Sequence, residues 1–208
     1  GYDFYPLQTI QPFALVDSLL RLGLSKPADV GVTTLDLSPR INGHLDAARR
    51  RAERGEVYAL QLPLPQDVPQ RQWHPDLVAY WKRFGDRIGD NIAPIPPPPV
   101  AGPVQIRALG VRPAVTRAIT PQDLDIIVEH LDALPDEERF DVIVATNILV
   151  YYDRFEQALA LTNVAKMLRP GGYFLTNYAM TAAPPFESTS IMSSVFFDRQ
   201  QNGDTMYC

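Results

Sequence analysis

Apolar positions at the start of the chain switch from helical spacing to strand spacing and back. Residues 8–22 (QTIQPFALVDSLLRL) carry apolar side chains at helical spacing, which predicts a helix. Residues 30–37 (VGVTTLDL) are apolar and rich in β-branched side chains, which is typical of a buried strand that ends in an acid. Ser38 followed by Pro39 is a helix-start signal, so we expect a helix from there to about Arg54.

Residues 56–103 interrupt this alternation. They hold most of the excess proline, in PLPQDVPQ and in IPPPPVAGP, and the second run indicates a stiff, extended connector. We interpret the block as a helical insertion with a proline-rich exit, and not as a second domain. Its aromatic side chains either form a lid over an acceptor or pack as a satellite cluster at the sheet edge. They are Trp73, Tyr80, Trp81 and Phe84.

The alternation resumes after the insertion. The predicted elements are a strand over 104–112, a helix over 120–131, a strand over 140–147, a helix over 153–168 and a strand that follows the turn RPGG. The closing stretch SSVFFDRQQNGDTMYC has two strand-like runs around Asn202-Gly203, a strong hairpin signal. It predicts two antiparallel strands at the end of the chain.

Strands that alternate with helices in this order form βαβ units on a mostly parallel sheet covered on both faces. The sequence therefore predicts an α/β fold with a doubly wound, Rossmann-like sheet and a C-terminal antiparallel hairpin, as a single domain over residues 1–208. A sheet of this type would begin with a strand before the first helix, and the sequence has none there. Because the chain starts at Gly1 and stops within a predicted strand, we expect both ends to be cut.

Composition and charge remove several classes of protein. Of the 208 residues, 46% are hydrophobic and 21% charged, which suits one globular domain. The net charge is −5 and the basic residues are scattered, so nucleic acid is not an expected partner. The single cysteine, Cys208, stands at the end, and no cysteine–histidine cluster has metal-ligand spacing. No apolar run approaches the roughly 20 residues that span a bilayer. We expect a cytoplasmic protein without a membrane partner, its oligomeric state open.

Two polar residues stand at the carboxyl ends of predicted strands, where open parallel sheets bind their ligands. Asp36 ends the strand over 30–37, and an acid there can accept both hydroxyls of a ribose. The alternative is that Asp36 only supports the Ser38 cap or an adjacent turn. Asn147 ends the strand over 140–147, and a buried amide needs partners for its hydrogen bonds. Those partners are either backbone carbonyls of the next loop or a small polar ligand.

Three segments follow one another at characteristic spacing: TTLDLSP, FDVIVATNILVYYDRFEQALALTNVAKML and the turn LRPGGYFL. Together they resemble the class I S-adenosylmethionine-dependent methyltransferases over most of residues 8–208 outside the insertion. The nearest pattern is the chemotaxis-receptor glutamate methyltransferase type, whose fourth strand ends in a string similar to residues 147–152. The resemblance also implies a bacterial protein.

The resemblance implies S-adenosylmethionine as cofactor and a small-molecule or protein side-chain acceptor. Asp36 would bind the cofactor ribose, Leu37 would flank the adenine next to Ser38, and Asn147 with Ile148 would line the methionine side. The strand over 140–147 would then end in an asparagine because it meets the cofactor there.

The acceptor side of the site is less defined. Tyr151 and Tyr152 are candidates for the acceptor pocket, against a packing role at the start of a helix. A catalytic base is needed only for an amine, phenol or hydroxyl acceptor. His44 and His130 are expected on helix surfaces, and His74 either approaches a substrate from the insertion or is solvated.

Two departures from the family pattern keep other functions open. The glycine-rich loop after the first strand is not in the sequence, with Gly1 as its possible remnant, and the predicted third strand ends in VRPAV without the usual acid. Both favour an inactive cofactor-binding or scaffold protein. A nicotinamide-dependent oxidoreductase also places an acid after the second strand, but it lacks the reversed final hairpin that the sequence predicts.

Overall fold

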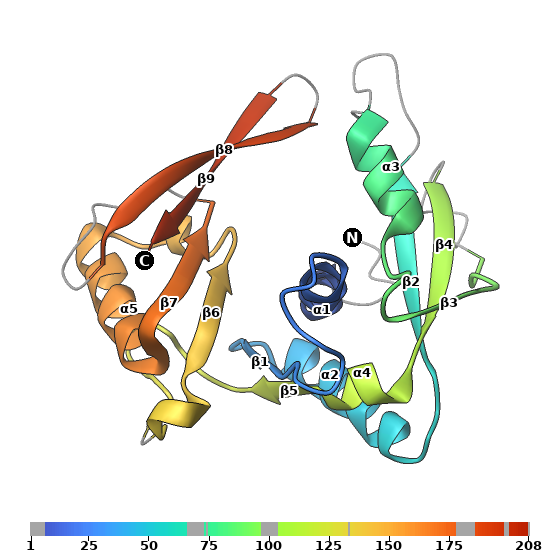
Figure 1. Ribbon diagram of the computed structural model, residues 1–208, viewed down its shortest axis with the longest axis horizontal. Helices are drawn as coiled ribbons and strands as arrows, with labels where there is room; N and C mark the ends of the chain where they lie inside the picture. Colours follow the sequence, from blue (N-terminus) through green and yellow to red (C-terminus); the bar gives the residue numbers. More distant parts are fainter. Residues whose placement is uncertain are drawn as a thin grey trace. The chain divides into compact units, whose positions relative to one another are not determined.

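The protein is described by a computed structural model that covers residues 7–65, 73, 75–96, 104–132, 134–177, 186–197 and 200–207. It forms two compact units, unit 1 over residues 1–123 and unit 2 over residues 124–208 (Figure 1). The predictions for Gly1, His74, Cys208 and most of the proline-rich exit fall outside the described residues.

Unit 1 begins with the helices and the strand that the sequence pattern predicts. The 3-10 helix η1 (Leu7–Ile10) leads into α1 (Gln11–Arg21), and β1 (Val32–Leu35) leads into α2 (Pro39–Glu53). Pro12 and Pro39 both stand in the first turn of a helix, where the missing N–H group costs no hydrogen bond. These three predictions are therefore confirmed.

Residues 56–103 contribute two strands, which the helical interpretation of the insertion missed, to a sheet completed by the strand that follows the insertion. β2 (Tyr58–Pro65), β3 (Gly89–Ile92) and β4 (Val104–Val111) form an antiparallel sheet in the order β2-β4-β3, with α3 (Pro75–Arg83) as its helix. The prolines of β2 and the short, polar sequence of β3 hide both strands from a pattern search. Pro63 and Pro65 are tolerated because β2 is an outer strand of this sheet.

The strand that pairs with β1 is β5 (Ile119–Gln122), which lies parallel to it. The predicted helix over 120–131 is wrong. Thr120 and Pro121 belong to this strand, and residues 123–131 form turns and loops, so His130 does not lie on a helix. Thr-Pro is also a helix-start signal, and pairing with β1 outweighs that local preference. The short helix α4 (Pro113–Arg117) lies between β4 and β5. β4, predicted as a strand of the parallel sheet, belongs to the antiparallel one.

The core of unit 1 joins the helices to both of its sheets. Phe13 of α1, Leu60 of β2, Leu109 of β4 and Ile88, which directly precedes β3, are buried there. The aromatic side chains of α3 and its end pack on this core: Phe84 is buried and Tyr80 lies against it. Trp81 donates its indole N–H to the Leu62 carbonyl over 3.2 Å. Of the two interpretations of the aromatic cluster, these contacts support packing on the sheet.

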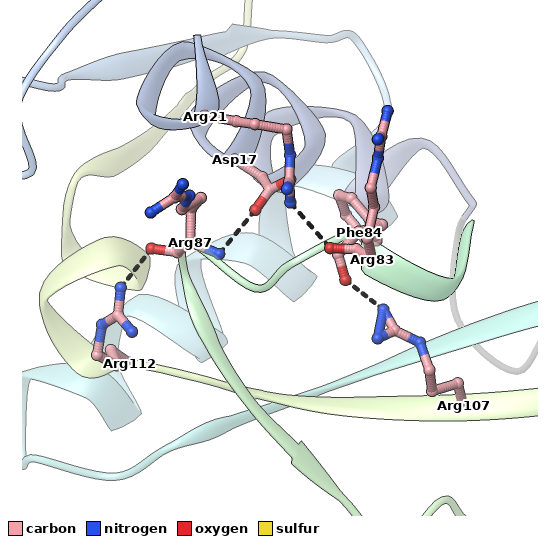
Figure 2. A network of polar contacts seen from close by, with 7 residues as sticks. All are labelled: Asp17, Arg21, Arg83, Phe84, Arg87, Arg107 and Arg112. Atoms are coloured by element: carbon pink, nitrogen blue, oxygen red, sulfur yellow. Dashed lines mark hydrogen bonds and ion pairs between the residues drawn. The ribbon is translucent and has the colours of Figure 1, made fainter. Parts of the chain in front are cut away.

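Arginines of α1, of β4 and of the N-cap position of α4 bind the end of α3 and the turn that follows it (Figure 2). Arg21 donates to the Arg83 carbonyl over 2.8 Å, Arg107 donates to the Phe84 carbonyl, and Arg112 donates to the Arg87 carbonyl. The three guanidinium groups therefore bind backbone carbonyls at the end of α3 and in the turn that follows it.

Asp17 holds the same turn from the α1 side (Figure 2). Its carboxylate is fully buried, accepts from Arg21 over 2.9 Å and from the backbone N–H of Arg87 over 3.0 Å. A buried carboxylate is stable only when paired and hydrogen-bonded, and both conditions are met here.

Unit 2 carries one four-stranded sheet, in the order β6-β7-β9-β8 (Figure 1). Its elements are η3 (Asp136–Glu138), β6 (Phe140–Ala145), η4 (Leu149–Tyr151), α5 (Arg154–Met167), β7 (Leu168–Thr176), β8 (Ser188–Phe197) and β9 (Gln200–Tyr207). β6 and β7 are parallel and α5 connects them, whereas β9 is antiparallel to both β7 and β8. The α/β class and the antiparallel C-terminal hairpin are confirmed.

The turn of that hairpin is not at Asn202-Gly203. β8 and β9 pair Phe197 with Gln200, and Gly203 lies inside β9 opposite Met192. Pairing along the full length of both strands outweighs this local turn signal.

α5 begins with a complete capping box. The Asp153 carboxylate accepts from the backbone N–H of Glu156 over 2.9 Å, and the Glu156 side chain accepts from the backbone N–H of Asp153 over 2.8 Å. The helix packs on β7 around Phe174, Leu161 and Val164, which are buried in the core of unit 2. A helix start near Asp153, expected from the sequence, is confirmed.

Candidate functional site

The strand exit at Asp36 is a closed hydrogen-bonded turn. The Asp36 N–H donates to the Gln122 carbonyl over 3.1 Å, and carboxylate oxygen Oδ1 accepts from the N–H of Ser38 over 2.8 Å. This is an Asx turn, which the sequence left open as an alternative to ligand binding. Ser38 occupies the N-cap position of α2, but its side chain makes no capping hydrogen bond. The second oxygen, Oδ2, has no partner among the described residues, so the turn leaves one acceptor for a ligand.

Asn42, one turn into α2, supports the Asp36 turn from behind. Its amide nitrogen Nδ2 donates to the Asp36 carbonyl over 2.7 Å. Its amide oxygen Oδ1 is buried and has no hydrogen-bond partner in the part of the chain that the structure describes. A buried acceptor without a partner costs free energy, so the Asn42 side chain holds this turn at some cost to stability.

A second acid, Asp123, stands beside Asp36, and the sequence interpretation missed it. Leu35 and Gln122 are partners in the parallel register, so Asp36 and Asp123 follow paired residues at the same edge of the sheet. Asp123 is exposed. The strand beside β1 is β5, and an acid follows it, whereas the predicted third strand that ends in VRPAV belongs to the antiparallel sheet. The signal was the acid directly after the run ITPQ, which the Thr-Pro cap pattern obscured.

In unit 2, the strand exit at Asn147 has a left-handed backbone. Asn147 has φ of 57°, and it is the one residue other than glycine with positive φ in the described ranges. Its backbone N–H donates to Asn177 Oδ1 over 2.9 Å, and Asn177 Nδ2 donates to Asn147 Oδ1 over 2.7 Å. The expected buried amide is in fact exposed, and its partner is a side chain from the end of β7.

The residues after Asn147 divide into packed and open positions. Leu149 is buried and Tyr152 packs on the core of unit 2, while Gln157 donates to the carbonyls of both residues over 3.0 and 2.9 Å. Tyr151 is 82% exposed and Ile148 is 40% exposed. Of the tyrosine pair, Tyr152 has the packing role that the sequence left open, and Tyr151 is the one exposed enough to meet a ligand.

The predicted site residues therefore lie in two groups. Unit 1 brings Asp36, Leu37 and Ser38 together with Asp123, and Leu37 is 54% exposed. In unit 2, Asn147 contacts Asn177, and Ile148, Tyr151 and Tyr152 follow Asn147 along the chain. That both groups contact one cofactor stays a prediction.

The histidines offer one unusual environment. His44 Nε2 lies 2.8 Å from the Tyr58 hydroxyl, which ties α2 to β2. Burial, with Arg51 and Arg40 nearby, lowers the pKa of His44, so its neutral form is favoured. Burial raises the pKa of Tyr58 to about 12. His44 is thus a half-buried partner of a tyrosine and not a surface residue. His130 lies 3.3 Å from Asp132.

Metal binding and membrane insertion find no support in the described ranges. No group of three or more His, Cys, Asp or Glu residues is placed there to hold a metal ion. No helix within these ranges has the length and apolar character needed to cross a bilayer.

Residues 108–176 match the family model described as "Methyltransferase domain". The match runs from within β4 to the end of β7 and includes Asp123, Asn147 and Tyr151. It spans 69 of the 208 residues, and Asp36 lies outside it. None of the curated proteins matches the chain in sequence.

Among solved structures, the chain is similar to the glycopeptide N-methyltransferase MtfA. The structure complexed with S-adenosyl-L-methionine is 17% identical with a TM-score of 0.36, over 93% of this chain and 54% of that one. The structure complexed with sinefungin is 16% identical with a TM-score of 0.34, and the match covers 85% of this chain and 54% of that one. A third MtfA structure is 15% identical with a TM-score of 0.34, over 98% and 75%. The chain spans about half the length of the first two.

Proposed function

We propose that the chain belongs to an S-adenosylmethionine-dependent methyltransferase that acts on a small-molecule or protein side-chain acceptor. The observation that carries the proposal is the pair of acids, Asp36 and Asp123, at the carboxyl ends of two adjacent parallel strands. The methyltransferase-domain match over residues 108–176 supports it independently. The likeness to the chemotaxis-receptor type stays a prediction.

The polar groups of unit 1 suit a ribose. A ribose presents hydroxyl donors, and Asp36 Oδ2 and the exposed Asp123 carboxylate supply acceptors at neighbouring strand ends. The Asn42 amide fixes the Asp36 turn, so that carboxylate is held in place before a ligand arrives. Pre-organisation of this kind reduces the entropy lost on binding.

When bound, the cofactor would supply a sulfonium methyl group: its S–CH₃ bond breaks as the bond from acceptor to methyl forms, leaving S-adenosylhomocysteine. The protein's part in such a displacement is alignment of the two reactants and exclusion of water. A carboxylate acceptor requires no base. The two rival functions are an inactive cofactor-binding scaffold and a nicotinamide-dependent oxidoreductase. Asp123 weakens one of the two arguments for the scaffold, because it is an acid after the strand beside β1, and the observed β8–β9 hairpin counts against the oxidoreductase.

The first experiment is calorimetric titration of S-adenosylhomocysteine, with NADH as the competing ligand. We expect micromolar binding of S-adenosylhomocysteine that Asp36→Ala and Asp123→Ala each weaken tenfold or more, about 1.4 kcal/mol. The control is Asp46→Ala, an exposed acid on α2 paired with Arg50, which should leave the affinity unchanged. Binding of NADH alone would favour the oxidoreductase, and binding of neither ligand would remove the methyltransferase proposal.

A further inference from the structure

The Asn147–Asn177 pair has an orientation that its own hydrogen bonds determine. A backbone N–H can only donate, so the Asn177 atom 2.9 Å from the Asn147 nitrogen must be the amide oxygen. The other Asn177 terminal atom is then the amide nitrogen, a donor. It faces Asn147 over 2.7 Å, so the Asn147 atom at that contact must be the amide oxygen. Neither amide can be reversed without losing a hydrogen bond.

These hydrogen bonds fix which end of the Asn147 side-chain amide points away from Asn177. With its Oδ1 turned to Asn177, Asn147 has its Nδ2 group, with two N–H donors, directed away from the pair. The nearest acids along the chain have other partners: Asp141 pairs with Arg169 over 2.8 Å, and Asp153 accepts from the backbone N–H of Glu156 in the capping box of α5. Within the described residues, the side chain of Asn147 is bound only through its Oδ1, so the two Nδ2 donors stay available at an exposed strand end.

The Asn147–Asn177 pair also stabilises the left-handed backbone at Asn147. A left-handed residue other than glycine persists where the surrounding structure holds it, and such residues cluster at ligand sites. Asn177 supplies that support, because it binds both the N–H and the side chain of Asn147. A single residue from the end of β7 thus sets the backbone and the amide orientation of the β6 exit.

We propose that Asn177 is a positioning residue that presents the Asn147 Nδ2 donors to an acceptor oxygen of a bound ligand, a carboxylate or a carbonyl. The assignment rests on the methyltransferase function proposed above, which offers two sources of such an oxygen: the amino-acid carboxylate of the cofactor and a carboxylate of the methyl acceptor.

The test follows the Asn147 side-chain amide resonances by ¹H–¹⁵N NMR, with three probes that separate the sources. 5′-Methylthioadenosine has the nucleoside without the amino-acid part, S-adenosylhomocysteine has both, and N-acetylglycine is a free carboxylate added over saturating S-adenosylhomocysteine. A shift with S-adenosylhomocysteine but not with methylthioadenosine assigns the oxygen to the cofactor. A shift only on addition of N-acetylglycine assigns it to the acceptor. No shift with any probe overturns the proposal.

Asn177→Asp tests the positioning role without removing the clamp. The substituted carboxylate would still accept the Asn147 N–H, but its second oxygen would force the Asn147 amide to turn over and present Oδ1 to the ligand. We expect the ligand-induced shift to disappear and the affinity for that probe to fall at least tenfold, with the melting temperature retained. Asn91→Asp adds the same charge on β3, where Asn91 contacts Arg107, and should leave the shift in place. A shift that survives Asn177→Asp would overturn the proposal.

A double-mutant cycle completes the design. If Asn177 acts through Asn147, then Asn147→Ala with Asn177→Ala should bind no more weakly than Asn147→Ala alone. Multiplicative losses would show that Asn177 acts separately and would overturn the positioning role. The ligand-free protein gives an independent check, since one Nδ2 proton of Asn177 should be slow to exchange and should become fast in Asn147→Ala. If S-adenosylhomocysteine fails to bind the unaltered protein, the proposed function fails, while this exchange still tests the clamp.

Discussion

Asp17 and Asp46 allow the contribution of a buried aspartate to the free energy of unfolding to be compared with that of an exposed one in the same protein. Each accepts from an arginine four residues later on its own helix, Asp17 from Arg21 and Asp46 from Arg50. The pairs differ in burial: Asp17 is fully buried and its arginine is 22% exposed, whereas Asp46 and Arg50 are 42% and 60% exposed. Asp17 also accepts the backbone N–H of Arg87 from the turn after α3.

The perturbation is Asp17→Ala, with Asp17→Asn and Asp46→Ala beside it. Hydrogen bonds to charged groups contribute about 1.5–3 kcal/mol each, and breaking a fully buried ion pair costs about 3–5 kcal/mol. Since Arg21 remains partly solvated and keeps its bond to the Arg83 carbonyl, we expect Asp17→Ala to lower the free energy of unfolding by about 2–4 kcal/mol. Asp17→Asn keeps an acceptor for Arg87 and should cost about half as much. Asp46→Ala should cost about 0.5 kcal/mol or less.

The assay is urea denaturation followed by circular dichroism, with all three variants measured at the same ionic strength. Raising the salt should reduce the small effect of Asp46→Ala and leave that of Asp17→Ala nearly unchanged, because buried pairs are little screened. The reasoning is refuted if Asp17→Ala and Asp46→Ala destabilise the protein equally.

Three further predictions concern other contacts. A Cβ on Gly89 would collide with the Gly110 carbonyl oxygen, so Gly89→Ala should weaken the β3–β4 pair and lower the melting temperature. Gly43→Ala, in open space inside α2, should instead raise stability by about 0.5–1 kcal/mol, and equal effects of the two variants in thermal melts would contradict this. Asp153→Ala removes the capping box of α5 and should cost about 1 kcal/mol in urea denaturation, with Asp132→Ala outside any helix as control. The pKa of His44 lies below its usual 6.5 in the folded protein, so the stability from its neutral form is present above pH 6.5 and is lost as the pH falls below it. Between pH 7 and pH 5, the His44→Gln variant should therefore lose less stability than the unaltered protein. Parallel curves of stability against pH for the two proteins would count against the assignment.

The elements that the sequence predicts well are those in which local signals and tertiary packing agree. β1 and β6 are short apolar runs in parallel pairs, and α5 begins at an aspartate with a glutamate three residues later. In each of them the same residues that favour the element also bury its apolar face. When local preference and packing agree in this way, the structure of a segment can be predicted from its sequence. β7 is predicted only in its apolar second half, because the strand begins at Leu168 and includes the residues RPGG that the sequence predicts as a turn.

The misses occur where a local signal points elsewhere. Thr120-Pro121 has the form of a helix start but lies in β5, and Asn202-Gly203 has the form of a hairpin turn but lies in β9. In the site, Asp36 and Asn147 are found at strand ends as predicted. Asp123 could be recognised only by knowing that β5 is the strand that pairs with β1. Asn177 could not be found at all, because its role depends on contact with a residue 30 positions away.

The two prolines of β2 have a consequence for the behaviour of the protein in solution. An outer strand offers a row of free N–H and C=O groups to any other chain, and this makes it a template for aggregation. Pro63 and Pro65 are two residues apart, so their nitrogens fall on the same side of β2, and neither can donate to an incoming strand. The opposite outer strand of this sheet, β3, is only four residues long. At one edge of the antiparallel sheet of unit 1 the prolines remove hydrogen-bond donors, and at the other edge the strand is too short to pair with much of another chain. The sheet should therefore resist polymerisation at the concentrations that crystallisation and NMR require.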